Sequence, residues 1–219
     1  MNVNIVGNDD IKSLEKAISK NLNVIVVKKF IKKNQCSFII DLCHKYSKTK
    51  IQKGIYYSID VLPKKVKTQR IFRTFIFKKF LDNNIGKKLI YIQEDIIKSK
   101  IPKNYHRRFQ VIHYPDGGGF FDWHKHQRYP SNYGIILNLS KYDKLNNGLT
   151  EFKYGKKIIK LTDNNIDAGD LILFKYDLTH RVSEVRPDKD LKFDKKGRWT
   201  LILPILQNKE LIYNHGNKK

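Results

Sequence analysis

The spacing of hydrophobic residues in the first half of the chain predicts three helices. Residues 9–20 open with acidic side chains and then place apolar residues three and four apart, which is the spacing of one buried helix face. Residues 34–46 repeat this spacing, and Asn34 stands where a helix cap is expected. Residues 77–100 also carry helical spacing, with an interruption expected at residues 83–86. Between these helices we expect a strand at 24–27 and strand or loop segments at 54–62 and 70–77.

After Pro102 the pattern changes to short runs in which apolar and polar residues alternate. Turn signals rich in Asn, Asp and Gly separate these runs, which is typical of an all-β sandwich or barrel. The strands expected here are 108–114, 134–139, 150–154, 156–161, 170–174, 181–185 and 199–205.

The order of these elements predicts one domain. At 219 residues the chain is long enough to bury a sizeable core. We expect residues 1–104 to form a helical and mixed support, residues 105–208 to form the β core and residues 209–219 to form a polar tail.

The chain is strongly basic, with 44 lysines and arginines against 21 acidic residues and a net charge of +23. Such a charge is compatible with binding to nucleic acid, an anionic membrane surface or an acidic substrate. The lysines are spread over every segment, however, so a compositional bias of the gene explains the charge without any polyanion. Nucleic-acid binding therefore has no support beyond the charge.

The two cysteines are expected to be buried thiols. Cys36 and Cys43 lie seven residues apart in a predicted helix, which separates them by about 10 Å, too far for a disulfide. No apolar run approaches the roughly 20 residues that span a bilayer, and the N-terminal residues lack a signal-peptide pattern. We expect a cytoplasmic protein.

Residues 114–126 hold the densest group of chemically useful side chains. A Gly-rich turn there leads to His124 and His126. Residues two apart on a strand point to the same side, so these imidazoles would project together, and Asp122 would join them if the strand starts early enough. Imidazoles aimed at one point suit a divalent transition metal. His180, far along the chain, is a third candidate.

These pieces, taken in order, resemble the iron(II)- and 2-oxoglutarate-dependent oxygenases, and within them the prolyl-hydroxylase-like branch. The resemblance covers roughly residues 23–206 and implies a mainly β protein with N-terminal helices, built as a double-stranded β-helix (a cupin-like jelly roll). The matching segments are Tyr114, 117–119, His124, His126, 148–152, 169–174, His180, Arg198 and Thr200.

The resemblance implies that His124, His126 and His180 hold the iron(II). The family has an aspartate where His126 stands, so three neutral imidazoles would leave the site one positive charge higher. Ligation by His126 is chemically reasonable because three-histidine iron sites occur among cupin-type dioxygenases. Asp122 could instead supply a carboxylate from the other side of His124, or the position could stay open to water, a halide or substrate.

The resemblance also implies where 2-oxoglutarate, the co-substrate, would bind. Its far carboxylate needs a buried cation with two parallel donors, a role that suits Arg198. Thr200 shares a strand face with Arg198 and could donate a hydrogen bond, as could Tyr114. Gln110 lies four residues before Tyr114 on the same expected strand, so it would face the same side and line the same pocket. The gap between His180 and Arg198 is longer than usual for the family, and we expect its excess to form a hairpin.

We therefore expect a dioxygenase that hydroxylates a C–H bond of an amino acid, a peptide or protein side chain, or another small metabolite. 2-Oxoglutarate would be converted to succinate and CO2. Arg128 and Lys125 could meet an anionic substrate, although solvated charge explains them equally well. One alternative is a three-histidine, cupin-like dioxygenase that does not use 2-oxoglutarate. Another is a degenerate, non-enzymatic module that binds nucleic acid or another polyanion.

Overall fold

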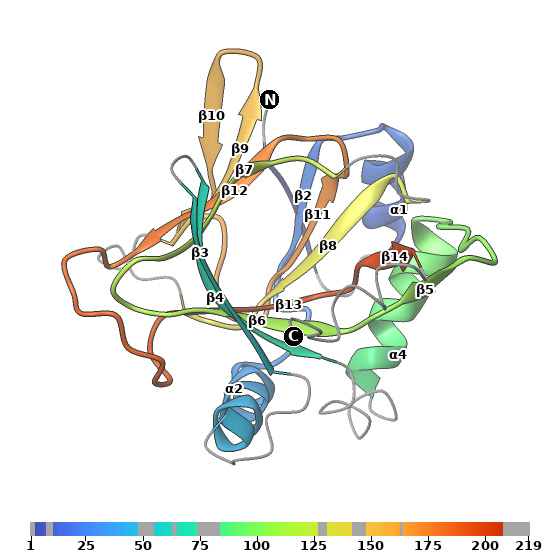
Figure 1. Cartoon of the computed structure of the whole chain (residues 1–219). Helices are drawn as coiled ribbons and strands as arrows, with labels where there is room; N and C mark the ends of the chain where they lie inside the picture. The colour runs from blue at the N-terminus through green and yellow to red at the C-terminus, as the bar shows by residue number, and fades with distance from the viewer. Residues whose placement is uncertain are drawn as a thin grey trace.

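The computed structural model shows short helices packed outside a curled β-sheet (Figure 1). The residues that it describes are 3–7, 11–47, 55–62, 65–73, 84–126, 131–141, 148–162 and 164–207. The helices are α1 (Ile11–Ser19), α2 (Lys33–Ser47) and α4 (Asn84–Tyr91), and α4 runs on into a π-helical turn, η2 (Ile92–Ile96). None of the described helices combines the length and the apolar character that crossing a bilayer requires.

The described strands form a large sheet and a small separate ribbon. Before residue 100 they are β1 (Asn4–Val6), β2 (Val24–Val27), β3 (Ile55–Leu62) and β4 (Lys65–Arg73). The later strands of the large sheet are β6 (Gln110–Tyr114), β7 (Gly119–His124), β8 (Tyr133–Asn138), β9 (Thr150–Tyr154), β10 (Lys157–Lys160), β11 (Leu171–Lys175), β12 (His180–Val185) and β13 (Arg198–Ile202). The ribbon pairs β5 (Tyr105–Arg107) with β14 (Ile205–Gln207).

The large sheet curls into two halves that face each other. Its strand order is β1-β2-β11-β8-β13-β6-β4-β7-β12-β9-β10, with β3 paired to β4. Strand β4 pairs with β3 along one edge; along its other edge it pairs with β7 at residues 67–68 and with β6 at residues 70–73, so it links the two halves. Figure 1 shows this curl, in which the sheet runs from β8 through β13, β6 and β4 to β7. This arrangement confirms the predicted double-stranded β-helix.

The larger half of the sheet comprises β1, β2, β11, β8, β13 and β6. Its strands have one face toward the helices and one toward the inside of the curl. On β13, Trp199 and Leu201 belong to the same hydrophobic cluster as Leu14 of α1 and Leu89 of α4. His113 of β6 stacks on Trp199, with ring centroids 4.0 Å apart. Because side chains alternate along a strand, the residues between these positions face inward. The helices therefore cover the outer face and leave the inner face for a site.

Several predicted elements lie where the sequence placed them. The strands predicted at 24–27 and 150–154 match β2 and β9 residue for residue. Both cysteines are buried and neither forms a disulfide, as expected, and burial raises the pKa of the Cys36 thiol to about 12. The predicted polar tail, 209–219, lies outside the described residues.

Three local predictions were wrong. Helix α4 already begins at Asn84, so residues 84–86 do not interrupt a helix; buried Ile85 starts its apolar face, and residues 77–83 lie outside the described part. Helix α2 begins one residue before Asn34, and Gln35 caps it by accepting a hydrogen bond from the backbone N–H of Lys32, at 2.9 Å.

The third wrong prediction is the hairpin between His180 and Arg198. This segment forms turns that fold back onto the turn between β6 and β7. Lys192 makes an isolated bridge with Asp116, and a Cβ on Gly117 would lie 2.3 Å from the backbone of Asp190. The segment forms no hairpin because its bridge at Lys192 is with that turn, and within itself it makes a turn at 186–189 rather than a strand pair.

Buried Asp170 ties the N-terminal part of the chain to the turn before β11. One carboxylate oxygen accepts a hydrogen bond from the backbone N–H of Lys29 at 2.8 Å, and the other accepts one from the backbone N–H of Asp167 at 2.7 Å. Lys28 forms an ion pair with the same carboxylate. Asp170 therefore satisfies two backbone donors and one cation at once.

We predict that Asp170→Ala lowers the free energy of unfolding by about 3 kcal/mol, because it leaves these donors without their acceptor. Thermal unfolding should show the midpoint falling by roughly 6–12 °C in a chain of this size. Asp188→Ala is the control, since Asp188 and Lys189 form an exposed pair at 3.5 Å; it should change stability by less than about 0.5 kcal/mol. Equal losses in both variants would contradict the anchoring role of Asp170.

Candidate metal and co-substrate site

The two halves of the sheet enclose a cavity between their inner faces. Its empty volume is about 610 Å³, counting the open mouth. Apolar side chains form much of the wall, and polar side chains gather in two groups. One group is the three histidines; the other comprises Arg198, Thr200, Thr150 and Tyr114.

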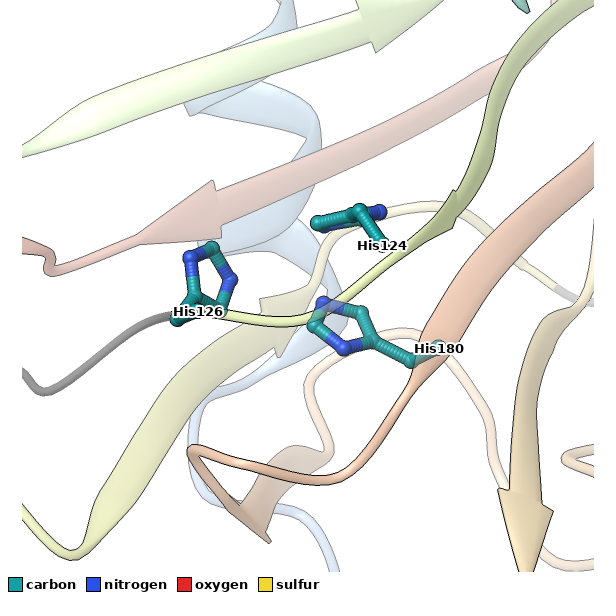
Figure 2. A group of neighbouring side chains, drawn as sticks. All are labelled: His124, His126 and His180. Atoms are coloured by element: carbon teal, nitrogen blue, oxygen red, sulfur yellow. The ribbon is translucent and has the colours of Figure 1, made fainter.

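The first polar group forms where β7 and β12 pair. His124 is the last residue of β7, His180 is the first of β12, and the two are direct partners in the antiparallel register. His126 lies two residues beyond β7, where its backbone N–H donates a hydrogen bond to the carbonyl oxygen of Tyr176 at 3.3 Å. The candidate ligand atoms of the three side chains lie within 4.8 Å of one another (Figure 2). Three imidazoles from separate positions of the chain are thus brought to one place.

Hydrogen bonds to the backbone set the orientation of two of these rings. His124 donates from Nδ1 to the carbonyl oxygen of Asp122 at 2.8 Å, and His180 donates from Nδ1 to the carbonyl oxygen of Leu178 at 2.9 Å. A carbonyl can only accept, so Nδ1 carries the proton and the lone pair lies on Nε2. Metal-binding histidines are commonly held in this way by their second nitrogen.

Burial favours the neutral form of His126 and His180. It lowers the pKa of His126 to about 4, and the proximity of His124 lowers it further in the same direction. Burial also lowers the pKa of His180 well below its ordinary value, and His124 again adds to the effect. Because a metal binds the unprotonated ring, His126 and His180 are ready for a cation at neutral pH.

The side chain of Asp122 does not join the cluster, contrary to the alternative that the sequence left open. The register changes along β7: His180 pairs with His124, whereas Val182 pairs with Phe121. A step of two residues along β12 thus corresponds to a step of three along β7, so β7 contains a β-bulge with one extra residue. Beyond the bulge, the side chains of β7 that face inward are shifted by one position. Phe121 therefore lines the cavity and stacks on His124, with ring centroids 3.9 Å apart. Asp122 contributes its carbonyl oxygen instead.

The second polar group is centred on Arg198, which is only 4% exposed. Arg198 is the register partner of Tyr114, and its guanidinium lies 5.7 Å from the centroid of the Tyr114 ring. One terminal nitrogen donates to the carbonyl oxygen of Gly148 at 2.8 Å and the other to the hydroxyl of Thr150 at 2.6 Å. This geometry holds the guanidinium rigidly and could present it to a carboxylate.

Two neighbours complete this group. Burial raises the pKa of Tyr114 to about 12, although the charge of Arg198 opposes the shift, so the phenol keeps its proton and can donate a hydrogen bond. Thr200 is buried and also lines the cavity. Thr150 was recognised in the sequence only as part of a motif, without a role of its own. The available signal in the sequence was its distance of two residues from Phe152, which puts both side chains on one face of the strand. The structure adds that Phe152 pairs with His180.

Most residues proposed from the sequence share this cavity. Gln110, the first residue of β6, is not among the residues that line the cavity, although its register partner Ile202 is. Lys125 is exposed, and Arg128 lies outside the described residues. The proposed residues that do line the cavity are His124, His126, His180, Arg198, Thr200 and Tyr114.

The chain has the double-stranded β-helix fold, and solved structures similar to it include 2-oxoglutarate- and iron(II)-dependent oxygenases. A prolyl hydroxylase from Trichoplax adhaerens, in complex with a hypoxia inducible factor peptide fragment, matches with a TM-score of 0.63 at 12% identity, over 95% of this chain and 94% of that one. A Pseudomonas putida prolyl-4-hydroxylase matches with a TM-score of 0.59 at 11% identity, over 90% and 98%.

A third similar structure is an oxidoreductase of the 2OG-Fe(II) oxygenase family from Burkholderia pseudomallei, with a TM-score of 0.58 at 11% identity over 94% and 96% of the two chains. No protein-family model and no curated protein matches the sequence. At these identities the likeness is one of fold, and it confirms at that level the resemblance seen in the sequence.

The lowered pKa of His126 makes the stability of the metal-free protein depend on pH. The unfolded chain protonates this residue near pH 6.5, but the folded chain does so only near pH 4. Between these values the unfolded state binds more protons, so the free energy of unfolding falls as the pH falls.

We predict that His126→Gln weakens this pH dependence. Between pH 7 and pH 5, the unfolding midpoint of the metal-free wild type should fall by roughly 3–6 °C more than that of the variant. Differential scanning calorimetry in the presence of a chelator measures both curves. The same decline in both proteins would show that His126 is not held neutral by burial.

Proposed function

We propose that this chain is an iron(II)- and 2-oxoglutarate-dependent oxygenase that hydroxylates a C–H bond and releases succinate and CO2. The observation that carries the proposal is the pairing, in one cavity, of a three-imidazole cluster with a buried, hydrogen-bonded arginine. A site for metal alone would not need the arginine. A chelating dicarboxylate uses both groups at once.

The spacing of the two groups suits the length of 2-oxoglutarate. Thr150, which contacts Arg198, lies two residues along β9 from Phe152, the partner of His180. Two residues of a strand span about 7 Å. The four C–C bonds of 2-oxoglutarate, at about 1.5 Å each, place its end carbons about 5 Å apart when extended. With a metal bond at one end and hydrogen bonds at the other, such a molecule can bridge the two groups.

The donor set fits iron(II), because three neutral imidazoles on one side of a cation leave other positions open. Bound iron would supply the redox chemistry. The protein's part is to hold His124 and His180 through their backbone hydrogen bonds, to bind the far carboxylate with Arg198, and to keep water out with the apolar wall.

We further propose that the substrate is an amino acid, a peptide or protein side chain, or another small metabolite. One of the similar structures holds a peptide fragment, which supports a peptide-like substrate. Proteins of one fold differ in substrate through their loops, so the loops at the mouth of the cavity would select among these substrates.

The first test is an anaerobic titration of the metal-free protein with iron(II) and then with 2-oxoglutarate, followed by visible absorbance. We predict a weak charge-transfer band that needs both additions. Succinate formation under air is the second readout. Tight iron binding without the band would favour the three-histidine dioxygenase that does not use 2-oxoglutarate, and failure to bind iron would refute both enzymes.

We predict that Arg198→Lys weakens 2-oxoglutarate binding about 10- to 100-fold, because an ammonium cannot replace two parallel donors. Iron binding by the same variant is the control and should stay within about twofold of the wild type, since the histidines are untouched. Calorimetric titration measures both affinities. Unchanged 2-oxoglutarate affinity in a folded variant would remove Arg198 from the site.

A further inference from the structure

The charge of the cavity has an unusual feature: its only formally charged lining residue, within the described part of the chain, is a cation. Arg198 lines the cavity, and no described Asp or Glu does so. Histidines bind a metal in their unprotonated, neutral form, so the three candidate ligands would add no charge to a loaded site. The described residues therefore offer this space positive charge and no compensating anion.

The acidic residues nearest in sequence to the cluster are engaged elsewhere. Buried Glu151 accepts a hydrogen bond from Arg181 at 2.7 Å and lies 3.7 Å from Lys160. The β-bulge excludes Asp122 from the histidine cluster, and Asp177 is exposed to solvent, where salt screens it. The chain as a whole carries a net charge of +23, so longer-range fields add positive rather than negative potential.

Loading the site makes this imbalance explicit. Iron(II) brings two positive charges and Arg198 one, whereas 2-oxoglutarate brings two negative charges. One positive charge therefore remains, and it lies at the metal end because the far carboxylate of 2-oxoglutarate neutralises Arg198. A carboxylate at position 126 would cancel it. A net charge in a largely apolar, buried space is costly unless a partner of opposite sign joins it.

We propose that the loaded site takes a third partner, a monoanion at the metal end, in the place of the charge that an aspartate at position 126 would have provided. This inference rests on the proposed function. The anion is either a carboxylate or similar group of the substrate, or a small inorganic anion such as a halide. Both share the chemistry that the site requires, namely one negative charge on a small ligand.

The test uses the cobalt(II)-loaded protein, whose visible bands report directly on the ligands of the metal, so no turnover is needed. Azide is titrated into this protein with 2-oxoglutarate at saturation. We expect the wild type to bind azide with a dissociation constant of about 1 mM or tighter. In His126→Asp, which supplies the missing charge, azide should bind at least about tenfold more weakly, a difference of about 1.4 kcal/mol.

Lys125→Gln is the matched control. It changes the net charge by the same one unit, at the neighbouring position, but its side chain is exposed and does not line the cavity. Its azide affinity should stay within about twofold of the wild type. A tenfold loss in Lys125→Gln would mean that overall charge, rather than the charge at the metal, governs anion binding, and would overturn the proposal.

Parallel titrations with chloride and acetate distinguish the two sources of the anion. Tighter binding of acetate indicates a carboxylate of the substrate, whereas tighter binding of chloride indicates an inorganic anion. Absence of any spectral change with azide, acetate or chloride in the wild type overturns the inference even if His126→Asp does not fold.

The same experiment separates the inference from the proposed function. Cobalt bands that respond to 2-oxoglutarate but not to anions refute the monoanion and leave the oxygenase standing. Cobalt bands that do not respond to 2-oxoglutarate, or failure to bind cobalt, count against the oxygenase itself.

Discussion

The site depends on one pairing, that of His124 with His180 across the antiparallel strands β7 and β12. Strand β12 also pairs with β9, so the same register fixes where Phe152 and Thr150 lie relative to the histidines. The bulge in β7 then selects which neighbours of His124 face the cavity. A shift of one residue in this register would turn the inner side chains outward. Backbone hydrogen bonding therefore determines the candidate metal centre.

The larger half of the sheet serves stability and function with the same strands. On β13, Trp199 and Leu201 pack into the core beneath the helices, while Arg198 and Thr200 face the cavity. Because side chains alternate along a strand, the residues that face the core determine which residues face the cavity. The helices matter to the site because they hold the outer face rigid, and a rigid sheet keeps the guanidinium of Arg198 on its two hydrogen-bond acceptors.

Charge distinguishes this site from the pattern with an aspartate in the second ligand position. Three imidazole ligands, neutral when they bind a metal, would leave the charge of a bound cation uncompensated by the described residues that line the cavity. The site can then select among ligands by their charge, because a buried site with excess positive charge favours a ligand that carries a negative charge. In this view His126 is a determinant of what the cavity accepts as well as a candidate ligand.

The sequence by itself determined the fold class, the order of the motifs and the three histidines, because alternation and turn residues are local signals. It also indicated Arg198, Thr200 and Tyr114, whose places follow from parity within single strands. Tertiary structure decided what depends on pairing between distant strands. The bulge in β7 excluded Asp122, the position of the cavity along β6 left Gln110 outside it, and the approach of β9 to β13 placed Thr150 on Arg198. Register and bulges arise from contacts between segments far apart in the chain, so no local pattern encodes them.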